Sequence, residues 1–427
     1  SISRERSAVN ACNCWKSLSV QGEPSDVFTA YRIKFNLRNT QSARQSVNRL
    51  SWLMTNKSFT TEAEELGKLR DEIDSIDQQI QQLVNKRAQC AQKVADVKEH
   101  FSTPGESVVF YRPEREAQVL RRVMERNQGP LPAEGVARLF REIMSQCLAL
   151  EEPMKIAYLG PEGTFTQQAA LKHFGHAVQC QSQSSIADVF REVEAGGANF
   201  GVVPVENSTE GVITHTLDSF VGSNLHICGE VALRIHHHFL MKEELMTNEA
   251  KQPIKVYSHA QSLAQCRQWL DANWPGIERI AVSSNAEAAR RAQEEDGAAA
   301  IASEAAAELY SLNIATANIE DMPDNTTRFL IIGKQETEIS GDDKTSLLIA
   351  SKNEPGALYH LLAPFHEEGV SLTRIETRPS KSGTWNYMFF IDLEGHQNEE
   401  KVKKAMALVQ QQCTDFKCLG SYPKAVL

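Results

Sequence analysis

The sequence has little that would place it in a membrane or on a nucleic acid. It contains no run of about 18 apolar residues, so we expect no membrane-spanning helix. It has 45 Lys and Arg against 55 Asp and Glu, and a net charge of −10 argues against a nucleic-acid surface. The nine cysteines are dispersed, and the close pairs Cys12/Cys14 and Cys413/Cys418 lack the spacing of a zinc site. Such dispersed cysteines are typical of reduced thiols and predict a cytoplasmic protein.

Motifs for nucleotides and metals are missing as well. No G-x-G-x-x-G follows an expected strand and no G-x-x-x-x-G-K-[ST] occurs, so we predict no nucleotide cofactor. His236, His237 and His238 are consecutive, and we expect residues 233–240 to form one strand. Only the first and third of these histidines would share a face of that strand, so we predict no metal site.

The first 53 residues differ from the rest in charge. They hold eight Lys or Arg and three Asp or Glu, a net charge of +5, and they lack the apolar core of a signal peptide. Met54 precedes Thr-Asn-Lys-Ser, which would make a normal start. We expect residues 1–61 to be a disordered or non-native leader, and a basic targeting arm is the alternative.

Three regions with different periodicities follow the leader. Residues 62–152 have helical apolar spacing, with helices expected at about 62–100, from Pro113 onward and at about 133–151. Residues 153–334 alternate strands with helical patterns, which is typical of an α/β domain; expected strands include 155–160, 201–205, 254–257 and 298–302. Residues 344–427 have the order βαββαβ of a ferredoxin-like α+β fold.

The first predicted helix carries cations on its apolar face. Arg87 and Lys98 continue a stripe with alternating three- and four-residue spacing: Leu66, Leu69, Ile73, Ile76, Ile80 and Leu83. A guanidinium cannot be neutralised in a protein, so on a packing face it needs a permanent anionic partner. We therefore predict an anionic ligand inside a helical bundle, with a structural ion pair as the alternative. A helix this long makes a poor core for one chain, so we expect a dimer.

Charged residues on the later helices extend this pattern. Residues 66–151 resemble the all-helical chorismate mutases through Leu69-Arg70, Arg87, Lys98, Arg115-Glu116 and Glu151. The resemblance implies that the partner subunit supplies Arg70. It also implies that Arg87, Arg115 and Lys98 bind the carboxylates and ether oxygen of chorismate, and that Glu116 binds its ring hydroxyl. Arg112 and Cys147 depart from the family pattern, so we expect contacts to the substrate hydroxyl that differ from those of the family.

Glu151 stands where some relatives have Gln, facing the ether oxygen of the substrate. A carboxyl group donates a hydrogen bond only when it is protonated. We therefore expect mutase activity to fall as Glu151 ionises.

Turns rich in hydroxyl groups follow several predicted strands of residues 153–334. Their candidate substrate-binding residues are Thr164, Glu206, Asn207, Ser208 and Ser258. This region resembles the prephenate dehydratases, most specifically through Tyr310-x-Leu312, Asp321 and Thr327-Arg328-Phe329-Leu330. The resemblance implies the two-lobed fold of type 2 periplasmic binding proteins, with Thr327 as the essential catalytic residue. We expect Arg328 to orient the substrate beside Thr327, and Glu206 is a second candidate proton donor.

Residues 344–427 resemble ACT domains, which sense small molecules in amino-acid metabolism. Two motifs carry this resemblance, Glu354-Pro-Gly-Ala-Leu358 and Glu376-Thr-Arg-Pro379. They imply that L-phenylalanine binds as an allosteric inhibitor. The candidate effector-binding residues are Gly356, Ala357, Leu358, Glu376, Thr377 and Arg378.

Together, the three resemblances imply a bifunctional chorismate mutase/prephenate dehydratase with a C-terminal ACT regulatory domain. Such an enzyme rearranges chorismate to prephenate, converts prephenate to phenylpyruvate and forms a homodimer or higher homo-oligomer. One alternative is a dehydratase whose mutase is impaired. The other is a non-enzymatic amino-acid sensor built on a solute-binding fold.

Overall fold

The computed structural model describes residues 62–101, 109–247, 252–351, 354–379 and 387–427. The predicted leader, residues 1–61, lies outside these ranges. The chain divides between Gln81 and Gln82 into two compact units. Apart from the part of helix α4 that precedes Gln82, every element below belongs to the second unit.

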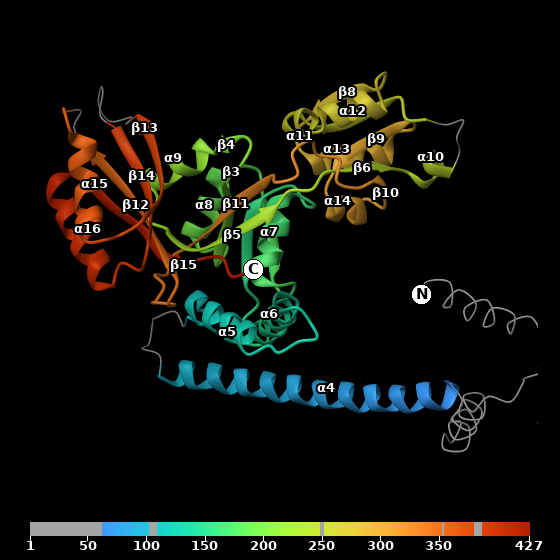
Figure 1. The fold of residues 1–427 in the computed structure, drawn as a ribbon, viewed down its shortest axis with the longest axis horizontal. Helices are drawn as coiled ribbons and strands as arrows, with labels where there is room; N and C mark the ends of the chain where they lie inside the picture. The colour runs from blue at the N-terminus through green and yellow to red at the C-terminus, as the bar shows by residue number, and fades with distance from the viewer. Residues whose placement is uncertain (1–61, 102–108, 248–251, 352–353, 380–386) are drawn as a thin grey trace, which may run out of the picture. The chain divides into compact units, whose positions relative to one another are not determined.

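The helical region consists of three helices, labelled in Figure 1: α4 Glu62–Phe101, α5 Pro113–Glu125 and α6 Ala133–Ala149. Helix α5 begins at Pro113, where the missing N–H of proline costs no helical hydrogen bond. Helices α5 and α6 pack on each other through buried residues that include Leu120, Val123 and Ala137. These bounds agree closely with the helices predicted from apolar spacing.

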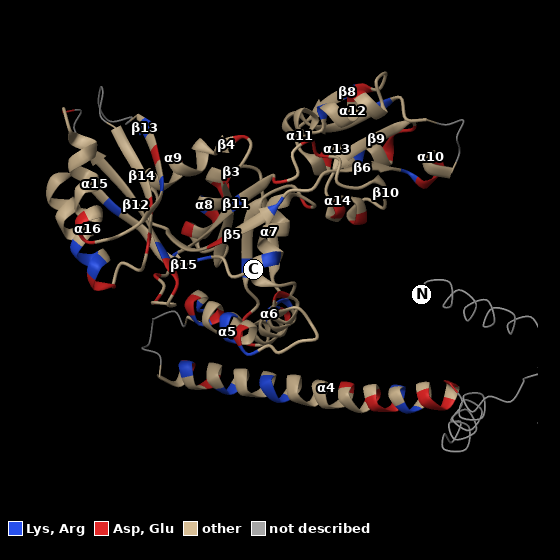
Figure 2. Ribbon diagram, in the orientation of Figure 1, with Lys and Arg blue, Asp and Glu red and all other residues tan. Residues whose placement is uncertain are grey.

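Helix α4 has charged ends and an exposed apolar face. Acidic residues lie in its first turn and Lys98 and His100 in its last, an arrangement that complements the helix dipole (Figure 2). Its apolar stripe remains open to solvent in the single chain, with Ile73 55% and Leu83 66% exposed.

Two sheets make up the α/β region, which is two-lobed as predicted (Figure 1). The first has the strand order β2-β1-β3-β11-β5, with β4 added beside β3. Its strands are β1 Lys155–Leu159, β2 Gln179–Gln183, β3 Phe200–Asn207, β4 Gly211–Val212, β5 His226–Arg234 and β11 Thr326–Gly333. Helices α7 Phe165–Phe174, α8 Ile186–Ala195 and α9 Thr214–Gly222 accompany this sheet.

The second sheet has the order β10-β6-β9-β7-β8. Its strands are β6 His238–Met241, β7 Lys255–His259, β8 Glu278–Val282, β9 Ala298–Ala302 and β10 Asn313–Thr316. The helices of this lobe are α10 Glu243–Thr247, α11 Ala260–Gln265, α12 Arg267–Asn273, α13 Asn285–Glu294 and α14 Glu304–Leu309. The chain therefore enters the second lobe after β5 and returns to the first lobe as β11.

The C-terminal unit has the predicted βαββαβ order. It comprises β12 Asp343–Ser351, α15 Ala357–Glu367, β13 Leu372–Pro379, β14 Tyr387–Glu394, α16 Glu400–Gln412 and β15 Asp415–Pro423. The strands form an antiparallel sheet in the order β13-β14-β12-β15. Leu348, Phe390 and Tyr422 of this sheet share one hydrophobic core with Phe220 and Ile227 of the first lobe.

Among the described residues, no helix is both long enough and apolar enough to cross a membrane.

Gly420 lies where the backbone of β15 approaches the backbone of β5. A Cβ atom at this position would lie 2.4 Å from the Ile227 carbonyl oxygen and 2.8 Å from its nitrogen. The φ of Gly420 is +140°, a conformation that L side chains rarely adopt. Only glycine lets β15 lie this close to β5.

We expect Gly420→Ala to destabilise the fold by about 1–3 kcal/mol, because the backbone of β5 must move away from the new methyl group. Thermal unfolding followed by circular dichroism measures the effect. Gly276→Ala is the matched control, because a Cβ there meets nothing within 4 Å. Equal melting temperatures for the two variants would contradict the close approach.

Candidate active sites

Thr327 lies opposite Asn207 in the antiparallel pairing of β11 with β3. Its side chain is nearly buried, at 8% exposure. The Nδ2 atom of Asn207 lies 2.8 Å from Thr327 Oγ1 and 2.8 Å from Asn325 Oδ1. The structure therefore brings together two predicted site residues that are 120 positions apart in the sequence.

The direction of the hydrogen bond between Asn207 and Thr327 follows from the turn after β3. Asn207 Oδ1 accepts from the backbone N–H groups of Thr209 and Glu210, each at 3.0 Å, and from Thr209 Oγ1 at 2.6 Å. Backbone N–H groups only donate, so the oxygen of the amide must face the turn and its NH₂ must face Thr327. Thr327 Oγ1 is therefore an acceptor, and its own hydrogen remains available for another group.

A further polar network lies behind Asn207. Asn325 Nδ2 donates to Gln265 Oε1 at 3.0 Å, and His237 Nε2 lies 2.8 Å from the same oxygen. Gln265 Nε2 donates to Thr209 Oγ1 at 3.1 Å, so the network returns to the turn that orients Asn207. Burial lowers the pKa of His237 and keeps the ring neutral. Because Gln265 belongs to α11, the network joins the two lobes.

The other predicted residues of the two-lobed region do not all meet at Thr327. Thr164 Oγ1 donates to the Leu159 carbonyl at 3.2 Å, and Ser208 Oγ donates to the Asp324 carbonyl at 3.2 Å. Ser258 is fully buried and donates to the Ile301 carbonyl at 2.7 Å, a structural role within the second lobe. Glu206 lies beside Asn207 on β3 and forms an ion pair with Arg374 of the C-terminal unit at 3.4 Å.

Arg328 has different surroundings from those we predicted. Its guanidinium donates to Glu230 at 2.8 Å, to Asp392 at 2.6 Å and to the Tyr422 hydroxyl at 2.9 Å. Successive side chains of a strand point to opposite faces, so Arg328 points away from Thr327. In this structure each nitrogen of the guanidinium donates to a protein group, and these groups hold Arg328 on the side of the ACT domain.

The prediction of one strand over residues 233–240 is wrong. Strand β5 ends at Arg234 and β6 begins at His238, so His236 and His237 lie in the crossover between the sheets. His236 Nδ1 lies 2.8 Å from Glu320, whose other oxygen accepts from the His237 N–H. No cluster of potential metal ligands occurs among the described residues.

Three predicted residues of the helical region lie near one another. Lys98 Nζ donates to the carbonyl oxygens of Val109 and Phe110 at 3.0 and 3.1 Å. Burial lowers the pKa of Lys98, and the negative charge of Glu151 opposes this shift. Burial raises the pKa of Glu151 despite the positive charges of Lys98 and Arg87. Arg70, on the N-terminal part of α4, is exposed.

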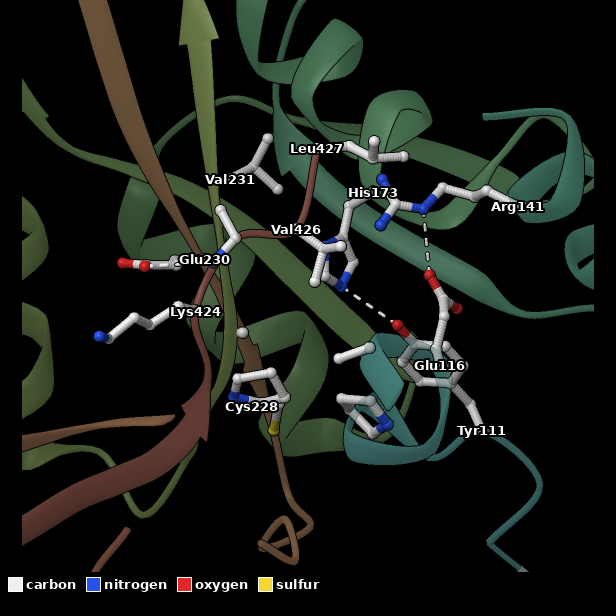
Figure 3. A pocket seen from close by; sticks show the side chains of 15 residues that line it. Tyr111, Glu116, Arg141, His173, Cys228, Glu230, Val231, Lys424, Val426 and Leu427 are labelled. Atoms are coloured by element: carbon white, nitrogen blue, oxygen red, sulfur yellow. Dashed lines mark hydrogen bonds and ion pairs between the residues drawn. The ribbon is translucent and has the colours of Figure 1, made fainter. Parts of the chain in front are cut away.

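Glu116 lines a pocket together with residues of the two-lobed region, and Figure 3 shows its carboxylate pointing toward Arg141 of α6. Its carboxylate lies 3.1 Å from Arg141 Nε, and Arg141 also donates to the Lys172 carbonyl at 2.8 Å. The ion pair uses one carboxylate oxygen of Glu116, so a contact to a substrate hydroxyl would have to be made by the other oxygen or share the first. Its neighbour Arg115 is exposed, so these two consecutive residues have different surroundings.

Tyr111 completes the contact between the helical and two-lobed regions. Its hydroxyl lies 3.1 Å from His173 Nε2, and its ring lies 5.4 Å from both Phe174 and Phe200. Burial and the charge of Arg141 lower the pKa of His173 to about 3, so this histidine is neutral.

The C-terminal unit contains a cavity of about 220 Å³ at the start of α15. Gly356, Ala357 and Leu358 line it, together with Ser351, Glu354, Tyr359, Tyr387 and Phe389. Thr377 is paired in register with Phe389, so the second predicted motif runs beside the cavity. Arg378 leaves it and forms an ion pair with Asp218 of α9 at 3.1 Å.

Three protein families match three consecutive regions of the chain. The chorismate mutase type II family matches residues 69–152, the prephenate dehydratase family matches residues 156–337 and the ACT domain family matches residues 345–407. A bifunctional chorismate mutase/prephenate dehydratase of Pseudomonas aeruginosa is 59% identical over 85% of this chain and 99% of its own length. The chain belongs to this bifunctional family.

Other relatives agree with this assignment. The bifunctional chorismate mutase/prephenate dehydratase of Neisseria gonorrhoeae is 52% identical over 84% of this chain and 97% of its own. The solved structure of a prephenate dehydratase from Arthrobacter aurescens, in complex with L-Phe, is 32% identical. It covers 63% of this chain and 90% of its own, with a TM-score of 0.58.

Sequence analysis named Thr327 and Asn207 as candidates but did not indicate the network of Asn325, Gln265 and His237 that lies behind Asn207. Asn325 lies just before the Thr327-Arg328-Phe329-Leu330 motif and is not part of it. Gln265 lies inside a helix and His237 in a crossover, and neither had a sequence pattern that would have indicated the contact.

We expect the pH dependence of the mutase to follow Glu151. Because burial raises its pKa, the protonated, donating form persists to a higher pH than in an exposed carboxyl group, and activity falls as pH rises through that pKa. Glu151→Gln should extend activity to higher pH in steady-state assays with chorismate. Dehydratase activity of the same variant is the internal control, and an unchanged mutase profile would refute the role.

We expect Asn207→Asp to lower dehydratase kcat by about 100-fold with a smaller change in KM, because a carboxylate would accept the Thr327 hydrogen that Asn207 leaves free. Assays with prephenate measure this loss. Ser219→Ala is the control, since that hydroxyl donates to the His215 carbonyl within α9. A fully active Asn207→Asp enzyme would show that the direction of this bond is unimportant.

Proposed function

We propose that the enzyme rearranges chorismate to prephenate in its helical domain and converts prephenate to phenylpyruvate in its two-lobed domain. The observation that carries the second step is the orientation of Asn207, which leaves the Thr327 hydrogen free. In the dehydratase step, the bond to the departing carboxylate breaks and its electrons complete the aromatic ring, while the ring hydroxyl leaves. Thr327 donates to that hydroxyl oxygen as the C–O bond breaks.

Threonine is a weak acid, so the proposed dehydratase mechanism depends on placement more than on proton transfer. The hydroxyl is held by Asn207, which is held in turn by the turn after β3. A donor fixed before the reaction needs no reorganisation when charge develops on the leaving oxygen. Aromatisation of the ring supplies the driving force.

The proposed mutase mechanism needs no nucleophile. Chorismate is a dianion, and its rearrangement is intramolecular, so the domain must hold the compact conformer and stabilise charge on the ether oxygen. Arg87, Lys98 and protonated Glu151 supply two cations and a donor near one another. Arg115, and Arg70 from a partner subunit, complete the carboxylate contacts in this proposal, and Glu116 takes the ring hydroxyl.

We also propose a homodimer built on the mutase domain. The apolar stripe of α4, including Ile73, Ile76, Ile80 and Leu83, is exposed in the single chain. A continuous apolar face of this length is typical of an interaction surface, and a second copy offers a matching one.

The cysteines of the described regions are free thiols, and dispersed free thiols support a cytoplasmic location.

L-phenylalanine is the proposed inhibitor. The cavity beside Gly356 offers backbone amides at a helix start for a carboxylate and the rings of Tyr387 and Phe389 for an aromatic side chain. The solved relative in complex with L-Phe supports this choice. Inhibition requires that L-phenylalanine bind one conformation of the enzyme better than another.

A reciprocal pair of substitutions tests the two activities. We expect Thr327→Ala to lower dehydratase activity at least 100-fold, by about the contribution of a positioned donor, while the mutase is unchanged. We expect Arg87→Ala to lower mutase activity by about 1,000-fold while dehydratase activity on added prephenate survives. The assay follows chorismate consumption and phenylpyruvate formation, with and without L-phenylalanine.

Thr326→Ala and Lys86→Ala are the neighbouring controls, since each removes a side chain next to the one tested. Retained dehydratase activity in Thr327→Ala would overturn the assignment of that residue. A chain that converts prephenate but never chorismate would be a dehydratase with an impaired mutase, and one that binds L-phenylalanine without turnover would be a sensor.

A further inference from the structure

A cluster of six charged residues connects the dehydratase lobe to the ACT domain. Three positive and three negative side chains take part, and we call them the interdomain charge cluster: Arg328, Glu230 and Glu206 of the first lobe, and Lys344, Arg374 and Asp392 of the ACT domain. Lys344 Nζ lies 2.8 Å from Glu230, and Ser346 Oγ donates to Asp392 at 2.6 Å. The charges balance, as buried charges must if they are to be tolerated.

The interdomain charge cluster begins one residue away from Asn207 and Thr327. In the β11–β3 register, Arg328 lies opposite Glu206 just as Thr327 lies opposite Asn207. The cluster therefore holds both strands of the pair, with Asp392 bound to β11 through Arg328 and Arg374 bound to β3 through Glu206. A displacement of either strand changes the distance from Asn207 to Thr327.

Arg374 is the least satisfied member of the interdomain charge cluster. Its side chain is 11% exposed, and its Nε lies 3.4 Å from Glu206. Its Nη2 atom is buried with no hydrogen-bond partner among the described residues. A buried guanidinium with a long contact and an unpaired nitrogen is stabilised by any small shift that brings a hydrogen-bond acceptor closer.

The strand that carries Arg374 also carries the proposed effector motif. Arg374 and Arg378 lie on the same face of β13, and both form ion pairs with the dehydratase lobe, to Glu206 and Asp218 respectively. Between them, Thr377 is paired with Phe389, which lines the ACT cavity. A ligand in that cavity therefore lies beside a strand attached to the dehydratase at two points.

We propose that two residues of the ACT domain, Arg374 and Asp392, are positioning residues for the dehydratase reaction. They act on the β3–β11 strand pair through Glu206 and Arg328. With the cavity empty, they hold the strands at the separation at which Asn207 donates to Thr327. A ligand in the cavity moves β13 and loosens this arrangement. The inference rests on the proposed roles of Thr327 and of L-phenylalanine.

The test separates ligand binding from its effect on catalysis in the full-length enzyme. We expect Arg374→Gln to lower dehydratase kcat by about tenfold with KM nearly unchanged, since the strand pair is displaced but the substrate contacts remain. We expect L-phenylalanine to bind as before in equilibrium dialysis but to inhibit less than half of the remaining activity. Asp392→Asn should act in the same direction, and Arg374→Lys should recover part of kcat.

Lys417→Gln is the matched control. Lys417 is a cation of the ACT domain that contacts the dehydratase lobe through the Phe220 and Ser223 carbonyls, away from the strand pair. Its variant should keep both kcat and inhibition. Mutase activity of each variant reports whether the chain has folded.

Two results would overturn the inference. One is an Arg374→Gln enzyme with the kcat and inhibition of the unmodified enzyme, and the other is a Lys417→Gln enzyme with the same losses as Arg374→Gln. Failure of the proposed function looks different, because the unmodified enzyme would then not bind L-phenylalanine or Thr327→Ala would remain an active dehydratase.

Discussion

The antiparallel pairing of β11 with both β3 and β5 is the constraint on which the dehydratase domain depends. The chain leaves the first lobe after β5 and builds the whole second lobe. It then returns as β11, which lies between β3 and β5, two strands about 100 residues or more before it in the sequence. This return places Thr327 opposite Asn207 and also brings Asn325 to the turn after β3. Without it, the polar side chains at the ends of separate strands would not meet.

The alternation of side chains along β11 assigns consecutive residues to different parts of the enzyme. Thr327 faces the amide network that orients its hydroxyl, whereas Arg328 faces the ACT domain and the charges that surround Asp392. Burial alone would raise the pKa of Asp392, but the charge of Arg328 and the Ser346 hydroxyl hold it below its ordinary value. The carboxylate is therefore ionised when it meets Arg328, and the two domains are joined by charges that neither could bury alone.

The sequence predicted the elements well because their periodicity is local. Helical spacing, as in α4 to α6, depends on neighbours three or four residues apart, and the strand patterns of the ACT domain depend on neighbours two residues apart. Contacts between distant segments were harder to predict. That Arg328 points away from Thr327 follows from strand geometry, but its partner Asp392 is 64 residues away and had no pattern to indicate it. The crossover at His236 was missed because its apolar flanks continue the pattern of a strand.

The contact of Tyr111 with Phe174 and Phe200 has a consequence for how this enzyme is related to single-activity ones. Tyr111 precedes the second mutase helix, yet its ring belongs to the hydrophobic core of the dehydratase lobe. A chain cut between the domains would leave a cavity in the hydrophobic core of the dehydratase fragment and a solvent-exposed tyrosine on the mutase fragment. The second and third mutase helices and the dehydratase lobe are therefore not independent of each other. Residues 82–427 form one compact unit that includes the second and third mutase helices and the dehydratase lobe, so neither would be expected to keep its full stability after separation.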